Sequence, residues 1–230
     1  MREGIDFKTI TTFFNTRSQY TKLLIYLIGV LFFVWISIDV VKWNWADDPI
    51  QKIVLAPLSE EPLKLLLSFY FCYVVLLFTH ISKIKKTDFP EIFMMCFIPA
   101  GMISGLLLGL IEGPFNNIIS HFSMTSIAAI LLVSFYIHVK NKSWRVSKKI
   151  LFMYTGLIPS MILHSIHNQY SNIGFVRNHP EFEYLVCVAR YLQDHTFLKT
   201  QSLFTMFEFV LAFFVLIIWF IVSVKYREKH

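Results

Sequence analysis

Residues 53–81 read IVLAPLSEEPLKLLLSFYFCYVVLLFTHI, an apolar run that carries two adjacent carboxylates, Glu60 and Glu61, and a lysine, Lys64, in its first half. About 20 predominantly apolar residues are enough for a helix to cross the hydrocarbon core of a bilayer. A charge at the bilayer centre costs about 2.5–3.5 kcal/mol on insertion scales, so charged residues in such segments usually have a function. The stretch therefore predicts a membrane-spanning helix with a functional polar cluster inside it.

The composition of the whole chain is that of an integral membrane protein. Of its 230 residues, 56% are hydrophobic and 17% aromatic, and the mean hydropathy is +0.58, whereas soluble domains average about 45–50% apolar residues. The first apolar run, 23–41, is too long for a signal-peptide core and has no small-residue cleavage site, so we expect a retained span. The three cysteines lie far apart and indicate neither a disulfide framework nor a cysteine zinc site.

Six apolar segments are each long enough to cross the hydrocarbon core as a helix. They are 23–41, 53–81, 92–111, 118–139, 150–167 and 203–224. The chain shows no internal repeat and no soluble domain. We therefore expect an all-α fold, a polytopic transmembrane helix bundle with about six spanning helices. It would form a single integral membrane domain over 1–230, with a motif-bearing core at about 53–168.

The basic residues predict the orientation of this bundle. Four alternating connectors hold fifteen of the 21 Lys and Arg: 1–22, 82–91, 140–149 and 225–230. By the positive-inside rule both termini face the cytoplasm, in a multi-pass protein of the cell membrane. The net charge of +6 therefore follows the topology and does not indicate a nucleic-acid partner. The extracytoplasmic connector 169–202 contains EFEYLVCVARYLQDH, which predicts either an interfacial helix over the site or an ordinary amphipathic surface helix.

With this topology, polar residues from three segments reach the same extracytoplasmic end of the bundle. The first group lies early in segment 53–81, the second follows segment 92–111, and the third ends segment 150–167. The groups are Glu60, Glu61 and Lys64; Glu112, Asn116 and His121; and His164, His167 and Asn168. Carboxylates, imidazoles and amides at one depth supply a general base, hydrogen-bond donors and an oxyanion partner. His167 and Asn116 are supporting candidates.

Other interpretations of the single groups stay open. Glu60, Glu61 and Lys64 also fit a structural ion pair, and Glu112 fits a helix-end carboxylate at the interface. Each histidine fits a hydrogen-bonded packing residue. Asp39 and Glu208 lie near the same end of their segments, where each either extends the site or meets the lipid headgroups, and we favour the headgroups. His80 and His138 lie among the basic residues at the other end and are interpreted as interface residues.

The ordered set of polar residues resembles the PrsW-type membrane proteases, related to the CAAX-processing and bacteriocin-processing (CPBP) glutamic endopeptidases. The resemblance rests on Glu60-Glu61-Pro62-Leu63-Lys64 for a Glu-Glu-x-x-Lys motif, on Glu112, on His121, and on His164 with Asn168. It implies that Glu60 activates a water with His121 or His164 and that Glu61 pairs with Lys64. It also implies that Asn168 and a histidine stabilise the oxyanion, without a metal or another cofactor.

The expected function is that of an intramembrane peptidase which cleaves a membrane-anchored protein or peptide near the extracytoplasmic face. Two alternatives remain. Two histidines and a glutamate are also a zinc ligand set with an open water position, although no HExxH helix is present. A non-enzymatic scaffold or transporter would use the same cluster to bind a partner or an ion. We also expect Pro62 to perturb its helix, because proline lacks a backbone donor.

Overall fold

Helices make up nearly all of the chain that the computed structural model describes. It describes residues 48–78, 89–113, 115–139 and 142–227, together with Thr21 and parts of 24–36. Within these ranges there is no strand, so the all-α prediction is confirmed. About half of the predicted first segment, 23–41, lies outside the described residues, as do Asp39 and His80.

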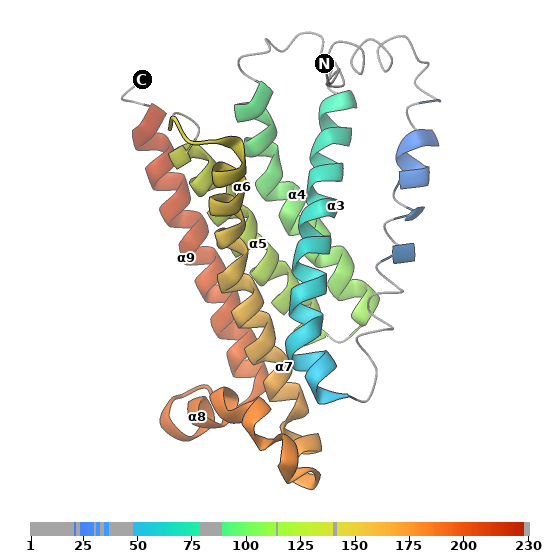
Figure 1. Ribbon diagram of the computed structural model, residues 1–230, viewed down its shortest axis with the longest axis vertical. Helices are drawn as coiled ribbons and strands as arrows, with labels where there is room; N and C mark the ends of the chain where they lie inside the picture. The colour runs from blue at the N-terminus through green and yellow to red at the C-terminus, as the bar shows by residue number, and fades with distance from the viewer. Residues whose placement is uncertain are drawn as a thin grey trace.

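α3, α4, α5, α9 and the stretch from α6 to α7 run alongside one another as a bundle, and a short helix, α8, lies across its lower end in Figure 1. The elements are η1 (Gln51–Leu55), α3 (Ala56–Phe78), α4 (Phe89–Glu112), α5 (Phe115–Val139), α6 (Val146–Tyr154), η3 (Thr155–Leu157), α7 (Ile158–Asn178), η4 (Pro180–Val186), α8 (Cys187–His195) and α9 (Gln201–Arg227). One predicted boundary is wrong: α7 continues past His167 to Asn178. The first part of the connector 169–202 is therefore helical.

Three stretches of the described residues are long and apolar enough to cross a membrane: Phe115–Val139, Ser147–Asn178 and Gln201–Ile221. A shorter apolar helix covers Cys96–Glu112. These helices are consistent with a membrane protein, while a total of about six spans stays a prediction.

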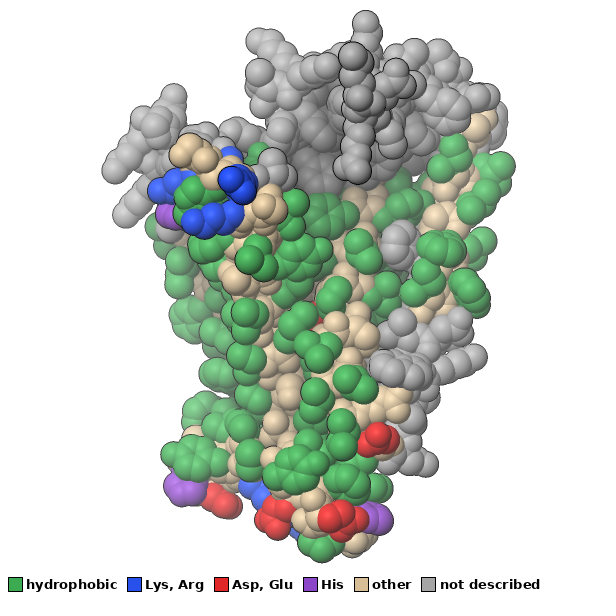
Figure 2. All heavy atoms as spheres, in the orientation of Figure 1, with side chains coloured by type: hydrophobic (Ala, Val, Ile, Leu, Met, Phe, Trp, Pro, Cys, Tyr) green, Lys and Arg blue, Asp and Glu red, His purple; other side chains and the backbone are tan. Residues whose placement is uncertain are grey.

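The surface in Figure 2 has the charge distribution of a membrane protein. Apolar side chains cover the middle of the visible face, with basic side chains at the upper end and acidic and histidine side chains at the lower end. Exposed residues of the upper group include Lys142, Arg145 and Lys148. Exposed residues of the lower group include Glu181, Glu183, Asp194, His179 and His195.

Glycines allow α4 and α5 to pack with their backbones in close approach. An added Cβ at Gly101 would lie 2.7 Å from the Ala129 Cβ, and one at Gly105 would lie 2.5 Å from the carbonyl oxygen of His121. Small residues at every fourth position are the usual way for membrane helices to approach this closely. This packing therefore fixes the height and distance of His121 relative to α4.

The end of α4 is also set by a glycine. Gly113 has φ +95° and its N–H donates to the carbonyl of Gly109 at 3.0 Å, which is the usual left-handed glycine that terminates a helix. Glu112 is therefore the last residue of α4, and α5 begins at Phe115 directly beside it. The tight reversal brings the Glu112 carboxyl to the first turn of α5.

The turn before α3 is the π-helix η1, and Pro57 leaves one of its backbone carbonyls without a backbone donor. Residue 57 is proline and has no N–H for the Lys52 carbonyl, which would be its π-helical acceptor. The Asn168 side chain of α7 supplies the missing donor, with Nδ2 at 2.8 Å from the Lys52 oxygen. Pro62 does not end its helix, since α3 is continuous from Ala56 to Phe78.

The segment after α7 packs back onto the bundle. The Tyr170 hydroxyl donates to the Leu198 carbonyl at 2.6 Å, and the Ala189 N–H donates to Gln169 Oε1 at 3.0 Å. Ala189, Tyr170, Leu198 and Phe204 form a small buried apolar cluster there. α8 is therefore a packed amphipathic helix, and none of its residues lines the cavity described below.

Candidate functional site

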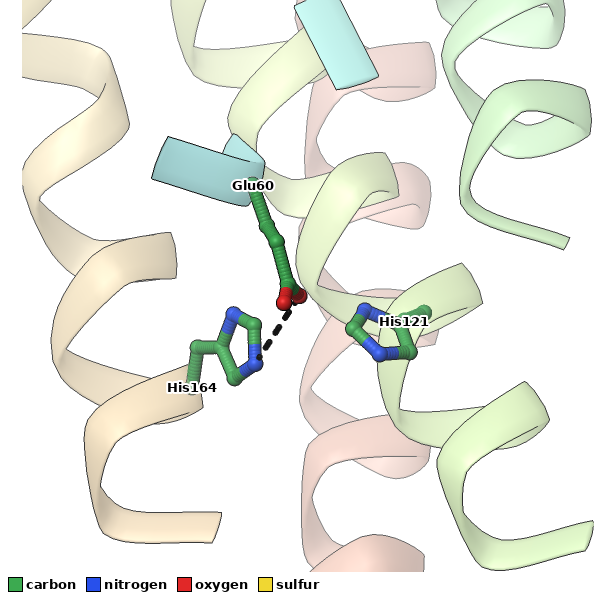
Figure 3. Close-up of side chains that lie close together, drawn as sticks. All are labelled: Glu60, His121 and His164. Atoms are coloured by element: carbon green, nitrogen blue, oxygen red, sulfur yellow. Dashed lines mark ion pairs between the residues drawn. The ribbon is translucent and has the colours of Figure 1, made fainter. Parts of the chain in front are cut away.

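Three helices bring Glu60, His121 and His164 together near the lower end of the bundle (Figure 3). Each residue is only 2% exposed. One side-chain oxygen or nitrogen of each lies within 4.8 Å of the others. His164 Nε2 is 3.5 Å from Glu60 Oε2, and the two imidazole rings are 5.0 Å apart and nearly perpendicular. The predicted convergence of these three side chains is therefore confirmed.

Glu61 contacts the His164 ring at Nδ1, the nitrogen that does not face Glu60. His164 Nδ1 is 2.9 Å from Glu61 Oε1, which also accepts a hydrogen bond from Lys64, while the Ser160 hydroxyl donates to Oε2. An ionised carboxylate can only accept, so Nδ1 carries the hydrogen in this contact. The other ring nitrogen, Nε2, is thereby directed at Glu60, and a neutral ring presents a lone pair there.

Glu112 has the same relation to His121. His121 Nε2 is 2.8 Å from Glu112 Oε2, and the Asn117 amide donates to the same oxygen at 3.0 Å. Nδ1 of His121 is buried and has no hydrogen-bond partner among the described residues. Each imidazole therefore has a carboxylate at one of its ring nitrogens.

A polar cavity of about 350 Å³ gives access to this cluster. Its lining residues come from η1, α3, α4, α5 and α7, and they are Lys52, Ala56, Glu60, Glu112, Asn117, His164, Asn168, Ser171 and Asn172. Ser171 is exposed, so the cavity reaches the molecular surface. Since one water occupies about 30 Å³ of liquid, the cavity has room for several waters beside Glu60.

The two predicted asparagines occupy different environments. Asn168 lines the cavity, although one of its amide hydrogens is used by the Lys52 carbonyl. Asn116 does not reach the cavity, because its amide donates to the Ser202 hydroxyl of α9 at 3.2 Å. Its neighbour Asn117 lines the cavity instead. The helical spacing could have identified it, since Asn117 is four residues before His121 and shares its face.

Glu208 is a correction to the sequence analysis, which favoured lipid headgroups over the site as its surroundings. Its side chain is fully buried, and Oε2 accepts the Ser120 hydroxyl at 2.5 Å and lies 3.3 Å from His167 Nδ1. The helical phase of α9 explains this, because the neighbouring Phe207 and Phe209 face outward. A lone carboxylate within an apolar run was the available signal. Ser120 and Ser160 were missed as well, although each lies near a selected histidine.

The cluster also satisfies several requirements of a metal site. Zinc bonds of about 2.0–2.2 Å place neighbouring ligand atoms of a tetrahedron about 3.3 Å apart, and the 3.5 Å between Glu60 and His164 is close to this value. Metal-binding histidines usually donate their second nitrogen to a carboxylate, as Glu61 and Glu112 would allow. Glu60, His121 Nδ1 and His164 Nε2 are therefore the atoms that could hold an ion.

Neither protein-family models, nor curated proteins, nor solved structures provide a match to this chain. Its function is therefore argued from the geometry of the site.

Proposed function

We propose that the protein is an intramembrane peptidase that cleaves a membrane-anchored protein near the extracytoplasmic face, with Glu60 as the base that activates water. The observation that carries the proposal is the placement of Glu60 in a polar, surface-connected cavity between two imidazoles that are each backed by a carboxylate. Burying these polar groups between apolar helices costs free energy, so their presence points to a role in binding or chemistry.

In the proposed reaction a cavity water lies between Glu60 and the substrate carbonyl. Glu60 takes a proton from the water as its oxygen attacks the carbonyl carbon, and the carbonyl oxygen becomes an oxyanion. The donors for that oxyanion are the second amide hydrogen of Asn117 or Asn168 and, once it is protonated, a ring nitrogen of His121 or His164 that does not contact a carboxylate. The proton then passes to the leaving nitrogen as the C–N bond breaks, which yields a carboxylic acid and an amine.

The neighbouring groups have supporting roles in this scheme. Glu61, paired with Lys64 and Ser160, keeps His164 Nε2 directed at Glu60. Glu112, which lines the cavity with Glu60 and lies 2.8 Å from His121 Nε2, orients the His121 ring. The order of these residues along the chain supports membership of the PrsW and CPBP type, which we include in the proposal together with six spans and cytoplasmic termini.

The first test is incubation of the purified protein in liposomes with a panel of single-span membrane proteins, beside the Glu60→Ala variant. Mass spectrometry of new chain ends should find fragments cut near one membrane face with the wild type alone. The same fragments from Glu60→Ala would contradict the proposal. A panel left intact by both proteins would favour the non-enzymatic scaffold or transporter.

A zinc peptidase is the second candidate, favoured by the donor atoms of Glu60, His121 and His164 and by the carboxylates behind both rings. In that case the metal would supply an activated water, and Glu60 would be a ligand. The two mechanisms separate in one comparison. A chelator should leave cleavage unchanged under the glutamate mechanism, whereas loss of cleavage with recovery on added zinc would establish the metal mechanism.

A further inference from the structure

Three polar side chains at four-residue spacing form a line on α7: His164, Asn168 and Asn172. All three line the cavity, as residues four apart on one helix face can. Ser171, next to Asn172, is exposed, so the line runs from the reacting groups toward the opening of the cavity. Asn172 has no role in the proposed reaction so far.

The amides of Asn168 and Asn172 are both fixed through their nitrogens. Asn168 Nδ2 donates to the Lys52 carbonyl at 2.8 Å, and Asn172 Nδ2 donates to the Asn168 carbonyl at 2.7 Å. Because a carbonyl oxygen only accepts, these contacts assign the nitrogen and leave Oδ1 as the open acceptor of each side chain. Among the described residues neither Oδ1 has a hydrogen-bond partner. Since an unpaired acceptor at a largely buried position costs free energy, the two oxygens fit a ligand that brings N–H donors into the cavity.

The spacing of the two oxygens' residues matches the main chain of an extended peptide. Four residues of an α-helix rise about 6 Å. In an extended chain the N–H groups on one edge recur every second residue, about 6.7 Å apart. The N–H groups inside a helix already donate to the carbonyl four residues earlier, so a helical ligand has none to offer. The pair therefore fits an unwound chain better than a helix.

We propose that Asn168 and Asn172 bind the substrate main chain and hold it extended along α7. This role rests on the peptidase proposal and names its substrate class. The eight residues from His164 to Asn172 span about 12 Å, which an extended chain covers in about four residues. The substrates are then membrane-anchored proteins in which about four non-helical residues lie beside the span at the outer face. Main-chain recognition tolerates many sequences, so weak helix propensity marks these substrates more than a sequence motif does.

The test uses a dye-labelled synthetic peptide with a Leu-Ala span of about 20 residues and a flank of about five glycines. The flank precedes the span in one peptide and follows it in a second, to cover both chain directions. Fluorescence anisotropy measures binding to the wild type in detergent micelles. Each glycine is replaced in turn by sarcosine, which has no N–H. Two replacements that lie two residues apart should each weaken binding by about 2–10-fold, the scale of one hydrogen bond, while the replacement between them should have no effect.

Asn172→Ala identifies the acceptor. The Asn172 amide donates only within α7, to the Asn168 carbonyl and the Ser171 hydroxyl, so this change breaks no contact between helices. It should weaken binding of the all-glycine peptide by the same factor and make one of the two sarcosine replacements silent. Asn178→Ala is the matched control, because Asn178 is an exposed asparagine of α7 that does not line the cavity, and it should bind like the wild type. If Asn172→Ala fails to fold, the sarcosine series on the wild type still decides.

Three results would overturn the inference: no binding of either glycine peptide, sarcosine effects without alternation, or full alternation in Asn172→Ala. Tighter binding of a peptide with lysine in the flank, together with indifference to sarcosine, would show that Glu60 and Glu112 select a basic side chain instead. Alternation with a flank that is never cut would refute the peptidase proposal and leave the binding pair standing. Cleavage of the substrate panel without alternation would do the opposite.

Discussion

At the residue scale, the site depends on how buried charges are paired. Glu61 and Lys64 are each about 1% exposed and contact each other three residues apart on α3. Glu61 also accepts hydrogen bonds from the Ser160 hydroxyl and from His164 Nδ1, so both of its carboxylate oxygens have partners. Glu60, one residue earlier, faces the cavity instead. Two adjacent glutamates therefore have different tasks because they point to different neighbours.

Lys64→Met tests this division of tasks. Removing the ammonium leaves the buried Glu61 without its cation, and breaking a buried pair typically costs about 3–5 kcal/mol. Denaturant titration of the protein in detergent should show this decrease in the free energy of unfolding. Adding Glu61→Gln to Lys64→Met should recover part of it, since no uncompensated charge then remains. Equal stability of Lys64→Met and the wild type would show that the pair is not a structural element.

Sequence position fixed the depth of each residue but not its direction or its neighbours. Glu60, His121 and His164 were predictable as one group because helices of alternating direction bring them to the same end. Asn117 was not identified, although its spacing of four residues from His121 places both side chains on one helix face. The burial of Glu208 depends on α9 packing beside α5 and α7, which no local pattern indicates.

At the element scale, α4 and α5 place His121 by close backbone packing. The Gly105 position faces the His121 carbonyl directly, so the distance between the helices is set at the height of the site. Similarly, the left-handed Gly113 ends α4 at Glu112 and allows Asn117 to reach back to it. Two glycines that carry no reactive group thus set the geometry of one imidazole and one carboxyl.

Gly105→Ala should separate the two helices at the site. The added Cβ would meet the His121 carbonyl oxygen at 2.5 Å, and overpacking of this kind typically costs about 1–3 kcal/mol. Thermal unfolding in detergent and the cleavage assay should both show a loss. Gly174→Ala in α7 is the control, because nothing lies within 4 Å of its added Cβ. If both variants behave alike, close packing at Gly105 does not position His121.

At the scale of the whole molecule, the two ends of the bundle differ in charge, and the site belongs to the end that carries η4 and α8. Basic side chains gather where α6 begins, and the cavity opens beside Ser171 at the opposite end of the bundle. If the positive-inside rule sets the orientation, the substrate is cut near the extracytoplasmic face. The orientation therefore decides which proteins can be substrates.

Natural and introduced cysteines can establish the orientation. Cys187 in α8 is exposed and Cys72 is buried, so a membrane-impermeant thiol reagent should label Cys187 in intact cells. In a Cys187→Ser background, Ser147→Cys at the basic end should be labelled only after the membrane is permeabilised. Labelling of Ser147→Cys in intact cells would reverse the topology and move the site to the cytoplasmic side.

The central claim is that Glu60 is the base in a hydrolytic reaction, and Glu60→Gln tests it most directly. Glutamine keeps the size and hydrogen bonding of the side chain but cannot accept the proton from water. On a substrate that the wild type cleaves, kcat should fall by about 10²–10⁴-fold. Binding of the substrate and the unfolding temperature should stay unchanged. Full cleavage by Glu60→Gln would contradict the account and remove Glu60 from the chemistry.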